Sequence, residues 1–498
     1  MKKLLKYFIP LCSGIVLISC YGLEKEEYRE LAPITVSGLE QTIYAKATEK
    51  LTLNNLRVES GNDHEIEYEW AYGRPQGDFP NMIDSTFISS SPTLDYTFEK
   101  AGQYVLRLRI DNGESIGFYY YNLQVRAGFD EGYLLLCDDG GVGTMAFVKV
   151  RSPQEEANNE QEIWNDVLSI NSEYNFRNLR DIYIFSTPGY TSGILISSGD
   201  DKGSIYRLDP VTLEVTYHMK SMDEYGILTN RIVGEKTSGT SHYAYLVGED
   251  GNLYRYEFPA NMLIRRETPY PIEFTYQGYG YYSGTGVNYG VREPVFFTAD
   301  GYVRCSNAKI IGAAAPEGYE FINFAGTRLG SEMYYAVTRS LKGSPREIKI
   351  LSTRGSNPSL SPVSGGTYLE TSPMLLDRNS KMVNTKLNTH AYYNYDNKIY
   401  HWAMGGTTPE VPAEGDQPDI TLPDGEQIMD ICTNAVPSTS STVIDDDKLL
   451  IATYNPTATD RKPGSLYLYD LRTMKKEKEW IGICEKPVAV AYKFPTSN

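Results

Sequence analysis

Residues 193–215, GILISSGDDKGSIYRLDPVTLEV, decide the expected fold because their pattern recurs along most of the chain. An apolar segment leads into a turn of Gly, Asp and Lys, and a second segment of small, aliphatic and aromatic residues follows. Two such segments separated by turn residues are typical of a β-hairpin. The stretch therefore predicts two neighbouring antiparallel strands.

Seven copies of this pattern follow one another, beginning at residues 132, 193, 243, 294, 334, 391 and 448. The six intervals between the turn residues Gly143 and Gly464 average about 53 residues, the size of a four-stranded propeller blade with its loops. The spacing predicts an all-β fold with a seven-bladed β-propeller over residues 130–496. We expect the segment VAVAYKF, from Val488, to pair with the first copy and close the ring. A pile of β-sandwiches of the same length is the alternative.

Short alternating segments also fill residues 32–127, among them ITVSGL, KLTLNNLRV and IEYEWAYG. Their alternation and their regularly spaced turn residues are typical of an immunoglobulin-like β-sandwich. Trp70 lies in the strand that supplies the core tryptophan of such folds. We therefore expect a separate N-terminal sandwich ahead of the propeller.

The first twenty residues, MKKLLKYFIPLCSGIVLISC, are typical of a bacterial lipoprotein signal peptide. Lysines precede an apolar run, and Leu17 to Cys20 match the lipobox, in which the cysteine thiol receives a diacylglycerol. Residues 1–19 are then the signal peptide, Cys20 is the lipidation site, and residues 20–31 form an acidic tether. A membrane-spanning helix is the alternative, but about a dozen apolar residues fall short of the ~20 that span a bilayer.

The chain has 498 residues and a formal net charge of −17. This charge argues against binding to nucleic acid and against electrostatic docking on anionic lipid. The cysteines beyond Cys20 are far apart and have no metal-ligand spacing. We expect them to be buried, unpaired thiols, and disulfides are the alternative because an exported protein with an even number of cysteines can form them. The four residues are Cys137, Cys305, Cys432 and Cys484.

No arrangement of residues in the sequence points to catalysis. The five histidines have neither metal-ligand spacing nor a companion nucleophile and acid, and the paired aspartates lie in predicted turns. We therefore expect no enzyme activity, no cofactor and no metal site. The alternative is a propeller enzyme, a glycosidase, lyase or peptidase, whose carboxylates or histidines would converge on the central channel.

The best candidate binding element is the loop 278–290, GYGYYSGTGVNYG. Its glycines let the backbone approach a ligand, and its tyrosines offer flat apolar faces with a polar tip, which suit a sugar or a peptide. The other interpretation is a Tyr-rich loop packed on its own blade. The candidate ligand-binding residues are Tyr279, Tyr281, Tyr282 and Tyr289.

Residues 153–171, PQEEANNEQEIWNDVLSIN, interrupt the repeats. Their apolar residues fall on one side of a helical period and predict a short amphipathic helix between the first two blades. These residues are Ile163, Trp164, Val167, Leu168 and Ile170.

Three stretches resemble parts of known surface proteins. Residues 96–111, YTFEKAGQYVLRLRID, resemble the PKD-domain signature, although Ala101 stands where proline is common and residues 71–79 lack the usual glycine–aspartate cluster. The segment EGYLLLCDDGG, from Glu131, resembles the strand that enters the propeller in the PKD-like family of Bacteroidota surface lipoproteins. The acidic tether resembles the export signal that follows the lipidated cysteine in Bacteroidota.

The resemblance implies a function that the residues alone do not. It implies an accessory, non-catalytic subunit, lipid-anchored on the outer face of the outer membrane. Its partners would be a Sus-type TonB-dependent transporter and the lipoprotein lid of that transporter, in a nutrient-uptake system. Such a subunit would help to capture oligopeptides or glycans. A structural spacer or an adhesin is a further alternative.

Overall fold

The computed structural model describes residues 31–498, apart from residues 48, 99–101, 127–128, 188–189, 239–240, 258–259, 269–270, 273–294, 298–300, 307–308, 327–332, 355–358, 435–445 and 495–498. It confirms the expected all-β fold class. In the described part of the chain, strands are accompanied by two five-residue helices, α1 (Pro153–Ala157) and α2 (Ser221–Tyr225), and by one 3-10 turn, η1 (Leu168–Ile170). The contacts divide the chain into unit 1, Met1–Arg126, and unit 2, Ala127–Asn498.

Nine strands are described in unit 1: β1 (Ile34–Ser37), β2 (Thr42–Lys46), β3 (Lys50–Leu53), β4 (Arg57–Ser60), β5 (Glu67–Pro75), β6 (Met82–Ser89), β7 (Leu94–Thr97), β8 (Gly102–Asp111) and β9 (Ile116–Arg126). Five of them form a sheet in the order β2-β9-β8-β5-β6, in which only the β2–β9 pair is parallel. The pairs β1–β4 and β3–β7 form two smaller sheets. Trp70 is fully buried in the core, and its indole N–H donates to the backbone oxygen of Ser91 at 3.0 Å.

Seven sheets are described in unit 2, and their strands are named below in spatial order. The first contains β12 (Ile163–Trp164), β11 (Val142–Lys149), β10 (Gly132–Asp139) and β36 (Pro487–Lys493). The second contains β13 (Leu179–Thr187), β14 (Tyr190–Ser198), β15 (Ser204–Leu208) and β16 (Val215–Lys220). The third contains β17 (Thr229–Ser238), β18 (Ser241–Gly248), β19 (Leu253–Glu257) and β20 (Met262–Arg266).

The remaining four sheets complete unit 2 among the described residues. The fourth contains β21 (Val295–Phe297), β22 (Gly301–Ser306) and β23 (Lys309–Ala314). The fifth contains β24 (Tyr319–Gly326), β25 (Met333–Ser340), β26 (Glu347–Arg354) and β27 (Ser361–Leu369). The sixth contains β28 (Met382–Asn384), β29 (His390–Tyr395), β30 (Lys398–Ala403) and β31 (Ile420–Thr421). The seventh contains β32 (Gln427–Thr433), β33 (Lys448–Tyr454), β34 (Gly464–Asp470) and β35 (Lys475–Cys484).

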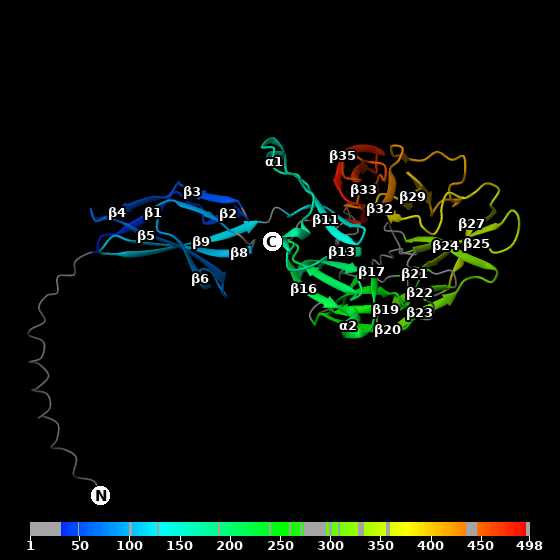
Figure 1. Ribbon diagram of the computed structural model, residues 1–498, viewed down its shortest axis with the longest axis horizontal. Helices are drawn as coiled ribbons and strands as arrows, with labels where there is room; N and C mark the ends of the chain where they lie inside the picture. Colours follow the sequence, from blue (N-terminus) through cyan, green and yellow to red (C-terminus); the bar gives the residue numbers. More distant parts are fainter. Residues whose placement is uncertain are drawn as a thin grey trace, which may run out of the picture. The chain divides into compact units, whose positions relative to one another are not determined.

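All seven predicted hairpins are present, one in each sheet. Strands β36, β13, β17, β24, β28 and β32 each stand at one edge of their sheet, and we call them the inner strands. Five pairs in this series contact one another: β36 contacts β13 and β32, β13 contacts β17, and β28 contacts β24 and β32. Strand β24 also contacts β21 of the fourth sheet. In Figure 1 the sheets follow from cyan β11 through green and yellow to red β35, which returns to β11.

The C-terminal segment VAVAYKF pairs with the first copy, as predicted. It lies in β36, which is antiparallel to β10, with Val490 opposite Leu135 and Ala491 opposite Leu134. The first sheet therefore contains both the earliest and the latest strand of unit 2.

The core of unit 2 lies between neighbouring sheets. Leu134 and Phe147 of the first sheet pack with Ile194 of the second. On its other face, Leu135 of the first sheet packs with Leu450 of the seventh. The first sheet is thus apolar on two faces, which explains why its strands are nearly continuous hydrophobic runs.

The predicted helix over residues 153–171 is wrong for most of its length. α1 covers only Pro153–Ala157, whereas Ile163–Trp164 form β12, which pairs with β11. The Trp164 ring lies 5.7 Å from the Phe147 ring. The helical spacing of the apolar residues does not decide the structure here, because packing of this indole on the first sheet stabilises a strand instead. Tertiary contacts commonly override local propensity in this way.

The described cysteine side chains are free thiols, as predicted. Cys137 and Cys484 are buried and Cys432 is partly buried; the side chain of Cys305 lies outside the described set. Burial raises the pKa of the Cys137 thiol, so it stays protonated. Among the described residues, no helix is long and apolar enough to cross a membrane.

Candidate ligand-binding site

Four inner strands have a β-bulge near their start, where the pairing with the next strand shifts register. In each of the four, a polar residue stands at this bulge. The residues are Asp181 in β13, Arg231 in β17, Asn323 in β24 and Asp430 in β32. A bulge of this kind interrupts the alternation of side chains along a strand and re-aims one of them. A polar group can therefore stand within a mainly apolar strand.

The two aspartates at these bulges bind the next inner strand. Asp181 Oδ2 accepts the backbone N–H of Ile232 in β17 at 3.0 Å. Asp430 Oδ2 accepts the backbone N–H of Val490 in β36 at 2.9 Å. Each carboxylate thus joins two neighbouring sheets of unit 2.

Asp181, Arg231, Asp430 and Lys381, the residue before β28, form a half-buried charged group. Burial raises the pKa of Asp181 to about 6, against the opposing effects of Arg231 and of the N–H of Ile232. Burial also raises the pKa of Asp430 and lowers that of Lys381. Each of these three pKa values responds to the charges of other members, so the four side chains interact electrostatically although they come from different sheets.

A polar depression of about 620 Å³ is lined by residues that are close along the chain to two members of this charged group. It is lined by the turn before β28, by the turn 394–397 between β29 and β30, and by residues 425–428 at the start of β32. Ser380 in the lining precedes Lys381 in the chain, and Ile428 lies two residues before Asp430. The starts of β28 and β32 therefore contribute both to the walls of the depression and to the charged group, through Lys381 and Asp430.

The turn before β28 is held by hydrogen bonds on two sides. Asp377 Oδ1 accepts the backbone N–H groups of Asn379 and Ser380 at 2.8 and 2.9 Å. From the fifth sheet, the buried Asn323 Nδ2 donates to the backbone oxygens of Asp377 and Ser380 at 2.9 and 3.0 Å. This wall of the depression is fixed before any ligand arrives.

The other walls are fixed in the same way. Asn394 Oδ1 accepts the backbone N–H of Lys381 at 2.7 Å. Glu426 is only 3% exposed; it accepts the Thr453 hydroxyl and forms an ion pair with Arg461 at 3.2 Å. Pre-organised walls lower the conformational cost of binding a ligand.

Several lining side chains remain available to a ligand. Asn379, Asp396 and Gln427 are exposed, and no hydrogen bond to a described residue occupies their side chains. Tyr395 lines the depression and is half-buried. The backbone φ of Asp396 is 52°, a value that Asp tolerates better than most residues at the tip of a tight turn.

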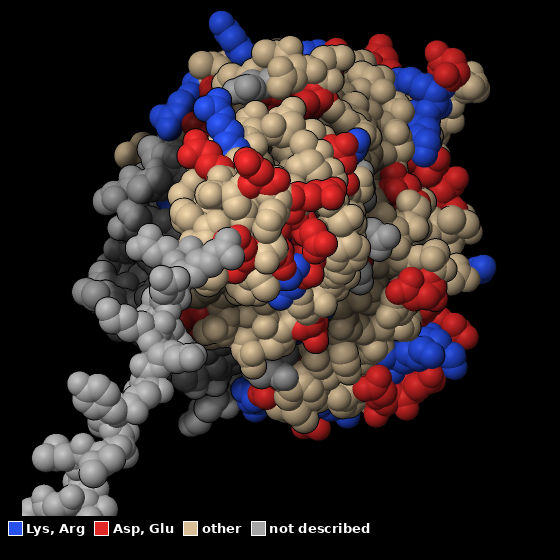
Figure 2. Space-filling view, turned by 90° about the vertical axis from the view of Figure 1, so that its left-hand side faces the viewer, with Lys and Arg blue, Asp and Glu red and all other residues tan. Residues whose placement is uncertain are grey.

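The charge of the lining is acidic. Asp377, Asp396 and Glu426 contribute carboxyl groups, and no Lys or Arg is among the described residues of the lining. On the face of the molecule drawn in Figure 2, Asp and Glu side chains likewise cover more area than Lys and Arg. An anionic ligand would therefore meet repulsion at the depression.

The predicted binding residues Tyr279, Tyr281, Tyr282 and Tyr289 lie outside the described residues, and so does Cys20. Along the chain, the Tyr-rich loop falls between β20 and β21. In the part of the chain that the structure covers, no group of three or more His, Cys, Asp or Glu side chains could hold a metal ion.

The sequence reasoning missed both the charged group and the depression. A signal for the charged group was present: single charged residues interrupt apolar strands, as in RDIYIF from Arg180 and MDICT from Met429. No sequence signal marked the depression, because its walls are turns whose residues are ordinary turn formers.

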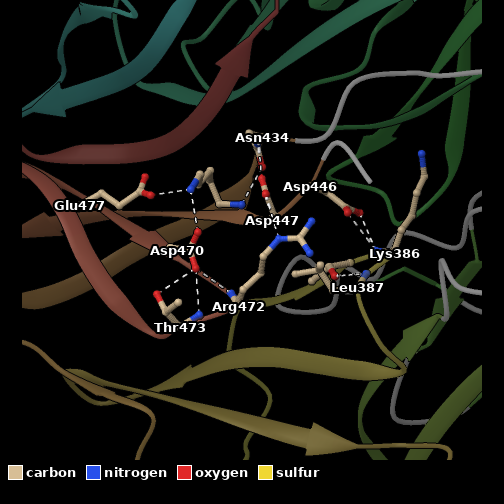
Figure 3. A network of polar contacts seen from close by, with 11 residues as sticks. Lys386, Leu387, Asn434, Asp446, Asp447, Asp470, Arg472, Thr473 and Glu477 are labelled. Atoms are coloured by element: carbon tan, nitrogen blue, oxygen red, sulfur yellow. Dashed lines mark hydrogen bonds and ion pairs between the residues drawn. The ribbon is translucent and has the colours of Figure 1, made fainter. Parts of the chain in front are cut away.

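A second polar network lies near the opposite ends of β28 and β32 and includes residues of β33, β34 and the turn after β34 (Figure 3). The buried Asp446 accepts the backbone N–H of Lys386 at 2.8 Å, and Asp470 accepts the Lys448 ammonium at 2.8 Å. Arg472 bonds Asp447 at 3.3 Å. Asp446 ties the loop after β28 to the seventh sheet, and the contacts of Asp447 and Asp470 lie within the seventh sheet, which supports a structural role for the network.

No protein-family profile matches the chain, and no curated protein sequence matches it. Among solved structures, it is similar to a quinonprotein alcohol dehydrogenase-like protein from Bacteroides thetaiotaomicron, with 13% identity and a TM-score of 0.39, over 94% of this chain and 99% of that chain. A DUF4784 family protein from Bacteroides caccae has 10% identity and a TM-score of 0.32, over 93% and 99%. AztD from Citrobacter koseri has 10% identity and a TM-score of 0.38, over 74% and 99%. At such low TM-scores these likenesses carry no weight for function.

Proposed function

We propose that unit 2 is a seven-bladed β-propeller and that unit 1 is a PKD-like sandwich. The seven hairpins, the contacts along the inner strands and the pairing of β36 with β10 support a closed ring, which removes open sheet edges. The buried Trp70 of β5 supports the sandwich.

In this proposal the protein is a non-catalytic, lipid-anchored accessory protein on the outer surface of the outer membrane. It helps a Sus-type TonB-dependent transporter and its lipoprotein lid to capture oligopeptides or glycans. The observation that carries the proposal is the polar depression, because its walls are held by internal hydrogen bonds while Asn379, Asp396 and Gln427 remain available. An anchor at Cys20 would raise the effective concentration of this site near a transporter in the same membrane.

One observation favours a second candidate function, hydrolysis. Asp181 and Asp430 are carboxyl groups with raised pKa values beside the depression, and glycosidases use carboxyl pairs with perturbed pKa values. Against this, each accepts a backbone N–H from the next inner strand, and Arg231 and Lys381 balance their charge. Release of products from a polysaccharide or peptide by the purified protein, abolished by Asp430→Asn, would establish the second function instead.

The proposed location is tested by cysteine substitution and surface proteolysis. Cys20→Ala should abolish acylation and release the protein from the membrane fraction, whereas the matched control Cys12→Ala should leave it anchored. Protease added to intact cells should degrade the wild-type protein, and its affinity purification from solubilised outer membrane should recover the transporter. Protection of the protein on intact cells would contradict surface display.

A further inference from the structure

We propose that the polar depression between the sixth and seventh sheets binds a neutral oligosaccharide. This inference rests on the proposed capture function and chooses between the two ligand classes that the function leaves open. The choice follows from the side chains that line the depression and from the way its walls are held.

The available side chains suit hydroxyl groups. Asp396 offers two acceptor oxygens, and the amides of Asn379 and Gln427 each offer both donors and an acceptor. A sugar ring presents hydroxyls that donate and accept at fixed spacings. The half-buried Tyr395 packs in part on the core cluster around Tyr393 and Trp402, and the side of it that lines the depression adds aromatic surface and a hydroxyl group for a sugar ring.

The charges of the lining select against acidic sugars. Asp396 and Asp377 are exposed carboxyl groups, and no lining residue is a Lys or Arg. The Arg461 guanidinium pairs with the buried Glu426 at 3.2 Å and is not part of the lining. Uronic acids and sulfated sugars would therefore bring a negative charge to a negative surface without a partner.

Peptides lack a suitable partner in this depression. A bound peptide is usually held by an apolar pocket for its side chains or by the open edge of a sheet for its main chain. Among the described residues of the lining, Ile428 is the one aliphatic side chain, and the others belong to turns and to the first residues of β32.

The rigid walls fit a ligand that is bound by many weak hydrogen bonds. Hydrogen bonds of Asn323, Asn394 and Glu426 fix the three lining segments. Each hydroxyl group of such a ligand exchanges a hydrogen bond to water for one to the protein, and this exchange contributes little net binding free energy. Its affinity then depends on donors and acceptors that need no reordering.

The experiment uses the purified full-length protein in detergent, with three sets of probes. Neutral oligosaccharides, uronic or sulfated oligosaccharides, and a mixture of oligopeptides are screened as immobilised arrays, and the best binder is titrated by calorimetry. We expect a neutral oligosaccharide to be the best binder. The double substitution Tyr395→Ala with Gln427→Ala should weaken it at least tenfold, and Tyr395→Phe should bind within about threefold of wild type, since the ring face remains.

Two further variants control for folding and for position. Gln161→Ala alters an exposed glutamine beside β12 on the first sheet and should bind as wild type. If the double variant melts at a lower temperature, the exposed Asn379→Ala replaces it and should weaken binding on its own.

The inference is overturned if an acidic sugar or a peptide is the preferred ligand, if no neutral oligosaccharide binds, or if the variants at Tyr395, Gln427 and Asn379 bind as wild type. The outcome is separable from the proposed location. Loss of surface display or of the transporter partner would refute the location, while sugar binding by the purified protein would stand.

Discussion

At the scale of single residues, Asp181 and Asp430 each connect two neighbouring sheets of unit 2. Each carboxyl group accepts a backbone N–H from the next inner strand, at 3.0 and 2.9 Å. Both pKa values are raised by burial, so these contacts come with a cost of desolvation. The opposite charges of Arg231 and Lys381 reduce that cost.

The raised pKa of Asp181 predicts how stability changes with pH. Its folded value of about 6 lies above the ordinary value of an aspartate, so the folded state binds this proton more tightly than the unfolded state does. The contribution of Asp181 to the free energy of unfolding therefore rises as the pH falls from above 6 towards about 4. Relative to Asp181→Asn, the wild type should gain on the order of 1–3 kcal/mol over this range.

The measurement is urea unfolding of the wild type and of Asp181→Asn at several pH values between about 7.5 and about 4.5, which bracket the shifted pKa. Titrating groups remote from Asp181 affect both proteins alike and cancel in the difference. A difference that stays constant with pH would show that Asp181 titrates as it does in the unfolded chain.

At the scale of elements, β36 is the strand on which unit 2 depends most. It supplies a partner for β10 along the first sheet, and its Val490 N–H binds Asp430. Ala489 and Val490 also pack into the clusters on the two faces of the first sheet. Its lysine, Lys493, is 1% exposed, and burial lowers the pKa of this side chain to about 8.

Removal of β36 should abolish cooperative folding of unit 2. A chain ending at Glu485 loses the pairing with β10 and exposes two apolar faces, which we expect to cost more than about 4 kcal/mol. A chain ending at Phe494 keeps β36 and should unfold as the wild type does. Soluble yield and thermal unfolding compare the two, and equal melting temperatures would show that β36 is dispensable.

At the scale of the whole molecule, each unit has a core of its own. The cluster around Trp70, Leu106 and Leu108 lies within unit 1, and the cluster around Trp402 and Tyr393 lies within unit 2. Cores that share no residues are expected to unfold in separate transitions.

Scanning calorimetry of two tryptophan variants tests this separation. Trp70→Ala should destabilise only the transition of unit 1, and Trp402→Ala only that of unit 2, each by about 3–5 kcal/mol because both side chains are fully buried. A single transition that both variants shift equally would show that the units unfold as one.

The sequence by itself determined the features that depend on neighbouring residues. Each hairpin, such as β14–β15, follows from alternation around a turn, and seven copies appear as seven hairpins. The pairing of VAVAYKF with β10 was also predictable, because a repeat that ends in an extra apolar strand needs a partner for it. The buried, free thiols of Cys137 and Cys484 followed from their apolar context.

Only the tertiary structure decided the position of Trp164 and the composition of the candidate site. The apolar period of residues 163–170 suits a helix, but pairing of Ile163–Trp164 with β11 packs the indole against Phe147. Asp181, Arg231, Lys381 and Asp430 come from four sheets, and local pattern carries no information about which sheets meet. The packing of the inner strands brings these charges together and places the polar depression beside them, and no spacing along the chain encodes that arrangement.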